Sequence, residues 1–196
     1  MKKFLSLLFS LFILSCKENN LKKFPIQSEN GFFQMVVEIP AGTNKKYEFD
    51  SESLTFIVDQ RDGKDRIINY LPYPGNYGFI PSTYCDPETG GDGDPVDVIL
   101  LCESLPQGSL VEIIPIGTIK LMDNQEEDYK IIAVPATDKL NHLGIKTWEE
   151  FQAQNKGISS ILEIWLKNYD SDDLEIKGWL NQVETMDYIE KRQIKF

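Results

Sequence analysis

The strongest constraint on the fold is a run of short apolar segments, separated by turn residues, through the first two thirds of the chain. These strand-like segments occupy residues 32–40, 45–50, 54–60, 96–101, 110–122 and 129–136. Short strands at such regular spacing are typical of a β-barrel or sandwich. The second and third flank a polar turn and predict a hairpin, and Pro115 predicts a bend or an edge in the fifth. Residues 71–81 hold three prolines and two glycines, which predict an ordered irregular loop.

The last third of the chain changes to a helical period. Residues 147–154 begin with a capping box between Thr147 and Glu150, and residues 181–193 predict a terminal helix. Between them, apolar residues at helical spacing predict a buried face made of Ile158, Ile161, Leu162, Trp165 and Leu166. With 196 residues, 41% of them hydrophobic, and no internal repeat, the sequence predicts one domain, a β-barrel with helices packed on it.

The first sixteen residues belong to another class of sequence. Two lysines precede an apolar run over residues 4–14, and "ILSC" ends at Cys16. A basic start and an apolar stretch of this length are typical of a secretory signal peptide, and the ending resembles a bacterial lipobox. We therefore expect a lipoprotein signal peptide over residues 1–15, a polar tether with lipidated Cys16 over 16–30, and the catalytic domain over 31–196. The implied location is an exported, membrane-anchored lipoprotein that faces the periplasm or the cell exterior; a short buried helix with a chance cysteine is the alternative.

The net charge of the chain limits the kinds of molecule that it can bind. The formal net charge is −11, which disfavours nucleic acid, because phosphate backbones select basic surfaces, and suits a protein that collects cations. The cysteines and the histidine allow further predictions. In an exported protein Cys85 and Cys102 can pair as a disulfide, or each can be a small core residue. The lone histidine, His142, falls in a predicted loop, where we expect it to be solvated.

The stretch "DGDPVD", residues 92–97, brings three aspartates within six positions. Asp and Gly are ordinary turn residues, so a solvated loop is the simplest interpretation. However, a proline after Asp94 favours an extended backbone, in which Asp92 and Asp94 share a face. If Asp97 joins them, the three form a site for a hard divalent cation. An EF-hand is excluded, because Asp97 occupies the position that requires glycine and an apolar strand follows.

Other acids and cations accompany the predicted strands: Glu38, Lys46, Glu48, the acidic residues of the run 123–128, and Lys130. Cations beside carboxylates are commonly surface ion pairs, but they also serve as clamps for a phosphate. Tyr73 and Tyr77 lie in the Pro- and Gly-rich segment, where a phenol either packs or donates to a phosphate oxygen.

The stretch "DGDPVDV" resembles the signature of the soluble family I inorganic pyrophosphatases, in which D-x-D-P-x-D precedes an apolar residue. The blocks "VVEIPAGTNKKYE", "YPGNYGFIP", "IPIGTIKLMDNQEEDYKIIAVP" and "NYDSDDLEIKGW" resemble the family in order and approximate spacing, so that the resemblance covers about residues 31–180. It implies a mainly β, α+β fold, a five-stranded OB-like closed β-barrel with flanking α-helices. It also implies hydrolysis of pyrophosphate to two phosphates by a metal-activated water.

The resemblance further implies roles for individual residues. The metal site would hold Asp92, Asp97, Asp123 and Asp128, with Glu38 and Glu48 in the same cavity. Asp94 would help to activate the attacking water. The phosphates would be held by Lys46, Arg66, Tyr73, Tyr77, Lys130 and Tyr169, of which Arg66, Tyr77 and Lys130 would also be catalytic. Arg61 is the alternative to Arg66. Several Mg²⁺ ions would offset the charge of the cavity and of the substrate, and Mn²⁺ suits the same oxygen ligands.

Two residues depart from the family pattern. Asn124 stands where an acid often follows Asp123, and Asp170 stands where a lysine frequently follows Tyr169. Lys167 and Lys177 are candidates to replace that lysine. These departures keep open an alternative, a non-catalytic lipoprotein that binds divalent cations or phosphate on the same scaffold. The resemblance implies a homo-oligomer, a hexamer as in bacterial relatives, although no contact surface is specified by the sequence.

Overall fold

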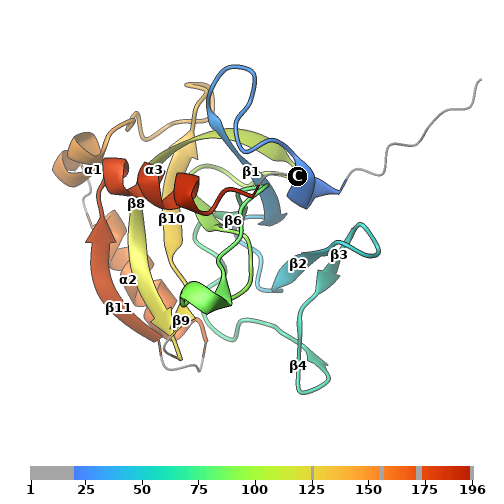
Figure 1. The fold of residues 1–196 in the computed structure, drawn as a ribbon. Helices are drawn as coiled ribbons and strands as arrows, with labels where there is room; N and C mark the ends of the chain where they lie inside the picture. The colour runs from blue at the N-terminus through green and yellow to red at the C-terminus, as the bar shows by residue number, and fades with distance from the viewer. Residues whose placement is uncertain (1–19, 125, 155–156, 171–173, 195–196) are drawn as a thin grey trace, which may run out of the picture.

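Five strands pair in a closed ring, which confirms the predicted mainly β, α+β fold (Figure 1). Around the ring they are β1 (Phe33–Ile39), β6 (Asn76–Phe79), β7 (Asp97–Leu100), β10 (Lys130–Pro135) and β8 (Leu110–Asp123). Neighbours are antiparallel except β7 and β10, which run parallel. A parallel pair brings the starts of two strands to the same end of the barrel. The carboxylates that precede or begin these strands therefore meet at one rim.

This computed structural model describes residues 20–124, 126–154, 157–170 and 174–194. The predicted signal peptide and Cys16 lie outside the described residues. Among the described residues, no helix is both long and apolar enough to cross a bilayer.

One strand prediction needs correction. The segment 71–81 is not irregular throughout, because it contains β6. There Gly78 allows a close approach of strands: a Cβ atom on it would lie 1.9 Å from the carbonyl oxygen of Val36 in β1. At Pro115, where the sequence predicted a bend or an edge, β8 continues, and the strand is 14 residues long. The register with β10 shifts at that point, and prolines within sheets are found at such bulges because they cannot donate a ladder hydrogen bond.

The smaller strands lie outside the ring. The predicted hairpin forms from β2 (Tyr47–Asp50) and β3 (Thr55–Val58), and β4 (Gln60–Arg61) with β5 (Lys64–Asp65) makes a second hairpin that projects from the barrel (Figure 1). β9 (Glu126–Glu127) and β11 (Leu174–Leu180) both pair with β8. The sequence patterns did not predict β11, whose residues are half-buried or exposed.

Three α-helices lie against this sheet within the described residues: α1 (Trp148–Gln154), α2 (Ile158–Asn168) and α3 (Gln182–Lys191). The predicted capping box of α1 is confirmed, because the Glu150 amide donates to Thr147 Oγ1 over 3.2 Å and the Thr147 amide donates to Glu150 Oε2 over 3.1 Å. One residue of the predicted apolar face of α2 is misplaced, because Ile161 is 59% exposed. The face that packs on the barrel instead centres on Leu162, Trp165 and Leu166.

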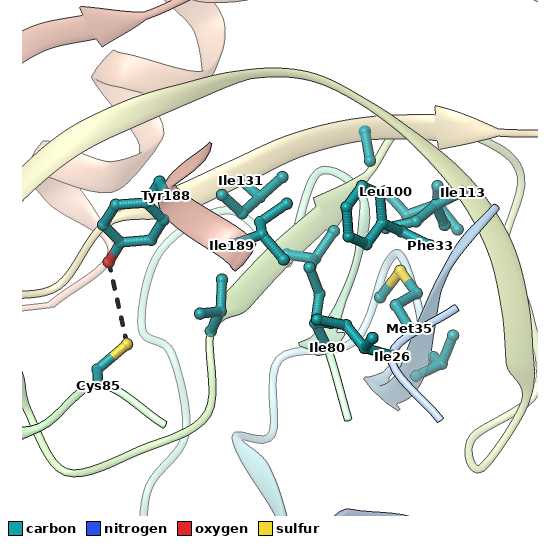
Figure 2. Packing of buried hydrophobic residues seen from close by; sticks show 14 residues of the cluster. Ile26, Phe33, Met35, Ile80, Cys85, Leu100, Ile113, Ile131, Tyr188 and Ile189 are labelled. Carbon is teal, nitrogen blue, oxygen red and sulfur yellow. Dashed lines mark hydrogen bonds between the residues drawn. The ribbon is translucent and has the colours of Figure 1, made fainter. Parts of the chain in front are cut away.

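The core divides between the two faces of the strands, which explains why β1 and β10 are buried along their whole length rather than on alternate residues. Figure 2 shows one cluster, in which Met35, Leu100 and Ile131 from three strands pack with Ile189 of α3. Cys85 lies at its edge as a free thiol, 3.9 Å from the Tyr188 hydroxyl, and Cys102 is also a free thiol. The two cysteines therefore do not form a disulfide.

We expected residues 20–30 to belong to a polar tether, but in the structure they pack against the barrel. A 3₁₀ turn, η1 (Leu21–Lys23), is fixed by the Ser82 amide, which donates to the Lys22 carbonyl over 2.8 Å. Ile26 is buried in the core cluster of Figure 2. This segment consequently carries Lys22 to the rim of the barrel where the acidic residues lie. A second 3₁₀ turn, η2 (Pro87–Thr89), precedes the aspartate-rich loop.

Candidate active site

Asp97, the first residue of β7, is the centre of a buried hydrogen-bonded group. Its register partner in β10 is Lys130, whose Nζ lies 2.5 Å from Asp97 Oδ2. The hydroxyl of Tyr77, from β6, donates to the same oxygen over 2.6 Å. Lys130 also pairs with Asp128, two residues before it. Three neighbouring strands thus direct an acid, a cation and a phenol to a single point.

Three carboxylates converge there. Oxygen atoms of Asp92, Asp97 and Asp128 all lie within 4.8 Å of one another, as required of a cation site with oxygen ligands. The trio expected from local spacing, with Asp94 as its third member, is wrong. Gly93 has φ +86° and breaks the extended run, so the Asp94 amide donates to Asp92 Oδ1 over 3.0 Å. Asp128 joins the group from a distant segment.

All thirteen predicted site residues line two adjoining cavities of about 170 and 90 Å³. The larger cavity is lined by Arg66, Tyr73, Asp92, Asp123, Asp128, Lys130 and Tyr169. The smaller one is lined by Glu38 and Glu48. The shared residues are Lys46, Tyr77, Asp94 and Asp97. The structure therefore brings the whole predicted set together, while the role of each residue stays a prediction.

A basic cluster faces the same space. Lys46 Nζ lies 2.8 Å from Glu48 Oε1 and 3.5 Å from Asp59 Oδ2, and Arg66 Nη1 lies 3.0 Å from the same Asp59 oxygen. Burial alone would lower the pKa of Lys46, but the carboxylate of Glu48 raises it above its usual value. The pKa of Lys130 is likewise raised despite its burial, by Asp128 and Asp97. Both lysines are therefore cationic throughout the physiological range.

Burial and repulsion between like charges raise the pKa values of acidic residues in the cavities. Burial, followed by repulsion from Asp97 and Asp128, raises the pKa of Asp92 to about 7. Burial raises the pKa of Glu38 to about 8, although the Phe49 amide donates to Glu38 Oε1 over 2.7 Å and opposes the shift. These carboxyl groups thus hold protons that a divalent cation would displace.

Three tyrosines form the wall beside the cations. The rings of Tyr73 and Tyr77 are 5.3 Å apart, and Tyr73 and Tyr169 are 6.4 Å apart. Trp165 of α2 stacks on Tyr169 at 4.6 Å and donates through Nε1 to the carbonyl of Leu71 over 2.9 Å. Burial raises the pKa of the Tyr73, Tyr77 and Tyr169 hydroxyls, which therefore remain donors at neutral pH.

Two residues beside the cavities escaped the sequence analysis: Lys22, which lines the smaller cavity, and Asp59, which pairs with Lys46 and Arg66. For these two, only the position of the chain in space reveals the role. Arg61, considered only as the alternative to Arg66, lines the larger cavity together with Arg66 and with Glu126 of the acidic run. Asp170, which pairs with Arg61, had already drawn attention through its departure from the family pattern. Asn124, the other departure, has φ +47° and its amide nitrogen lies 2.8 Å from Asp123 Oδ1.

His142 lies outside both of these cavities and is exposed, as expected. It lines a separate apolar hollow with Cys102 and Leu143.

Comparisons with known proteins point to one family. A family model described as inorganic pyrophosphatase matches residues 35–195. The inorganic pyrophosphatase of Synechocystis sp. is 31% identical over 163 residues, 82% of this chain and 89% of that protein. The inorganic pyrophosphatase of Sulfolobus acidocaldarius is 33% identical over 174 residues, 87% of this chain and 94% of that protein. The crystal structure of inorganic pyrophosphatase from Thermus thermophilus matches with a TM-score of 0.69 at 26% identity, over 88% of this chain and 96% of that one.

Proposed function

The chain belongs to the inorganic pyrophosphatase family and hydrolyses inorganic pyrophosphate, and from this premise we propose how its own residues divide the work. One observation carries the proposal: a single cavity is lined by an acidic cluster, Asp92, Asp97 and Asp128, and by a basic pair, Lys46 and Arg66. A diphosphate in such a cavity meets metal ions at the acidic cluster. Its outer oxygens accept charge-assisted hydrogen bonds from the basic pair.

The donor set fits Mg²⁺, because hard divalent cations prefer carboxylate oxygens and three lie within 4.8 Å of one another. We assign Mg²⁺ to Asp92, Asp97 and Asp128, with Asp123, Glu38 and Glu48 completing the acidic lining. When bound, the ions neutralise the diphosphate, polarise its oxygens and lower the pKa of water. Mn²⁺ suits the same ligands.

Asp94 is assigned to the attacking water as its proton acceptor. It lines both cavities and is not held by the Lys130 ion pairs that occupy Asp97 and Asp128. Although the residue is exposed overall, desolvation of its carboxyl and repulsion from Asp97 raise the pKa of Asp94. A base whose pKa moves toward neutrality is better matched to proton transfer near pH 7.

The phosphate groups are assigned to the cations and phenols. Lys46 and Arg66 are anchored by Asp59, which fixes their spacing before substrate arrives. Lys130 offsets the charge of Asp97 and Asp128 and orients the hydroxyl of Tyr77 through their shared oxygen. Tyr73 and Tyr169 line the same cavity as further hydroxyl donors.

Phosphate release from pyrophosphate in Mg²⁺ tests these assignments with Asp94→Asn and Asp97→Asn. The matched control is Asp138→Asn, an exposed acid outside both cavities. We expect each site variant to lose at least about 100-fold in kcat, the scale of a lost general base or charge partner, and the control to keep the parent rate. Turnover retained in both site variants would remove the proposed site. No turnover in the parent protein would favour the non-catalytic binder.

We also propose that Cys16 carries a lipid and that the chain faces the periplasm or the cell exterior. The support is the basic start, the apolar run over residues 4–14 and the ending "ILSC". Metabolic labelling with palmitate compares the parent with Cys16→Ala. We expect label in the parent and none in the variant, and equal labelling of the two would contradict the anchor.

A homo-oligomer is the third proposal, with a hexamer as the expected size. Its support is an apolar surface beside the site: Ile161 and Ile164 on α2 are 59% and 56% exposed, and Leu71, next to α2 through Trp165, is 63% exposed. Such residues together indicate a contact surface. Light scattering after size exclusion should give a multiple of the chain mass, reduced by Ile164→Glu but not by Lys167→Glu on the same helix. A monomeric parent would contradict this proposal.

A further inference from the structure

Asp170 joins two arginines at the edge of the larger cavity. Arg61 Nη1 donates to Asp170 Oδ1 over 2.7 Å, and Arg66 Nη2 pairs with the other oxygen, Oδ2. The Asp170 side chain is only 9% exposed, so this pair of contacts is held more firmly than an ordinary surface ion pair. Each carboxylate oxygen therefore fixes one guanidinium.

The contact connects two distant parts of the chain. Arg61 belongs to β4, in the hairpin that projects from the barrel, and Asp170 follows Tyr169 at the end of α2 (Figure 1). Through Asp170, the hairpin is tied beside the cavity, whose lining includes both Arg61 and Arg66. Lys167 and Lys177 do not line either cavity, and Lys177 Nζ instead lies 2.5 Å from Glu175 Oε1. Neither is therefore the additional cation of the site.

We propose that Arg61 is a second guanidinium that binds the phosphate of the substrate, and that Asp170 is the positioning residue that aligns it with Arg66. The inference rests on the proposed function and concerns the same cavity. A guanidinium offers five N–H donors in a planar fork. A planar fork with several donors can hold a carboxylate and a phosphate oxygen, and Arg61 lines the cavity while it pairs with Asp170. Arg61 also adds positive charge where Asp170 would otherwise leave the edge of the cavity more acidic.

The sharpest test uses binding, so that it does not depend on turnover. Imidodiphosphate, a diphosphate analogue with nitrogen at the bridge, is titrated calorimetrically into the protein in Mg²⁺. The variant is Arg61→Gln. The matched control is Lys64→Gln, which removes the same charge from the register partner of Arg61, a residue outside both cavities.

We expect the Kd to rise about tenfold in Arg61→Gln, the size of a lost charge-assisted hydrogen bond, and less than about twofold in Lys64→Gln. The difference between the rise in Kd of Arg61→Gln and that of Lys64→Gln should shrink in high salt, because Arg61 is partly exposed and salt screens its charge. Equal changes in the two variants would overturn the inference. Failure of the parent to hydrolyse pyrophosphate while it binds the analogue would instead count against the proposed function, and the Kd comparison would still decide the role of Arg61.

The positioning role of Asp170 has its own readout. Asp170→Asn keeps the size of the side chain and removes its charge, and we expect it to raise the KM for pyrophosphate with a smaller effect on kcat. In the double variant Arg61→Gln/Asp170→Asn, the KM should rise by less than the product of the two single changes, because Asp170 acts in part through Arg61. Arg61→Lys should recover only part of the loss, since an ammonium lacks the fork. If the KM of the double variant rose by the full product of the two single changes, the positioning role of Asp170 would be overturned.

Discussion

At the scale of single residues, the site depends on Lys130. Its ammonium is buried between Asp97 and Asp128, and no other cation of the described chain pairs with either acid. Burial raises the pKa of Asp97 even though Lys130 opposes that shift, so the acid is already costly to hold. A divalent cation nearby would share with Lys130 the task of compensating these charges.

Replacement of Lys130 by methionine should therefore destabilise the metal-free protein strongly. A buried charge left without its partner typically costs about 3–5 kcal/mol in the free energy of unfolding. Urea denaturation in EDTA measures the loss, and Lys167→Met, on the exposed side of α2, is the matched control. We also expect Mg²⁺ to stabilise Lys130→Met more than it stabilises the parent. A loss no larger than that of the control would mean that Lys130 does not support the acidic cluster.

At the scale of elements, β6 shows how one glycine sets the distance between strands. The Gly78 Cα faces the Val36 carbonyl so closely that no side chain fits, and Tyr77 beside it must reach Asp97 from the same strand. A displacement of β6 would therefore move the phenol as well as the backbone. β6 therefore links the packing of the barrel to the position of the Tyr77 hydroxyl in the cavity.

Gly78→Ala tests this link. We expect a loss of about 3 kcal/mol in the free energy of unfolding, because β1 and β6 must separate to admit the methyl group. Gly31→Ala is the comparison, since Gly31 has φ +79° and open space around it, and a side chain in that backbone conformation costs about 1–2 kcal/mol. Thermal unfolding of both variants measures the two losses in stability. Similar losses would mean that the close approach at Gly78 is easily relieved.

Local patterns predicted most of these elements. Two strand-like segments around a polar turn marked the β2–β3 hairpin, and the Thr147–Glu150 box marked the start of α1. Patterns failed where tertiary contacts override local signals. β6 contains Gly78 because β1 passes too close there for a Cβ atom, and β11 is a strand because β8 offers it an edge.

At the scale of the whole molecule, the site gathers acids that are far apart in sequence, and its charge couples to pH. The pKa of Glu38 is raised from 4.5 to about 8, chiefly by burial, and that of Asp92 to about 7. An acid whose folded-state pKa is raised binds its proton more tightly when folded. Its contribution to stability is complete below pH 4.5 and is lost as the pH rises through the folded-state value.

The metal-free protein should therefore lose stability as the pH rises from about 4.5 to 8. Glu38→Gln keeps an acceptor for the Phe49 amide and cannot ionise, so its stability should fall less over this range. At pH 8 we expect it to exceed the parent by on the order of 1–3 kcal/mol in EDTA. Urea denaturation across the pH range measures both curves. Parallel curves for parent and variant would show that Glu38 does not titrate in this window.

The site could be predicted from sequence only through resemblance to a family. Local reasoning found the aspartates of residues 92–97 but chose the wrong third ligand, because the contribution of Asp128 depends on the parallel pairing of β7 with β10. Lys22 carries no local signal, and the sequence offered Arg61 only in place of Arg66, not beside it. Arg61 and Lys22 reach the cavities because a projecting hairpin and the N-terminal segment fold back beside the barrel.

The central claim is that Asp92, Asp97 and Asp128 hold a divalent cation together. Calorimetric titration of Mn²⁺ at pH 7, in two buffers of different ionisation enthalpy, tests it without recourse to turnover. We predict that the parent binds Mn²⁺ with release of protons, and that Asp128→Asn weakens binding at least about tenfold while Asp138→Asn leaves it unchanged. Equal Mn²⁺ affinity in the parent and in Asp128→Asn would contradict the account.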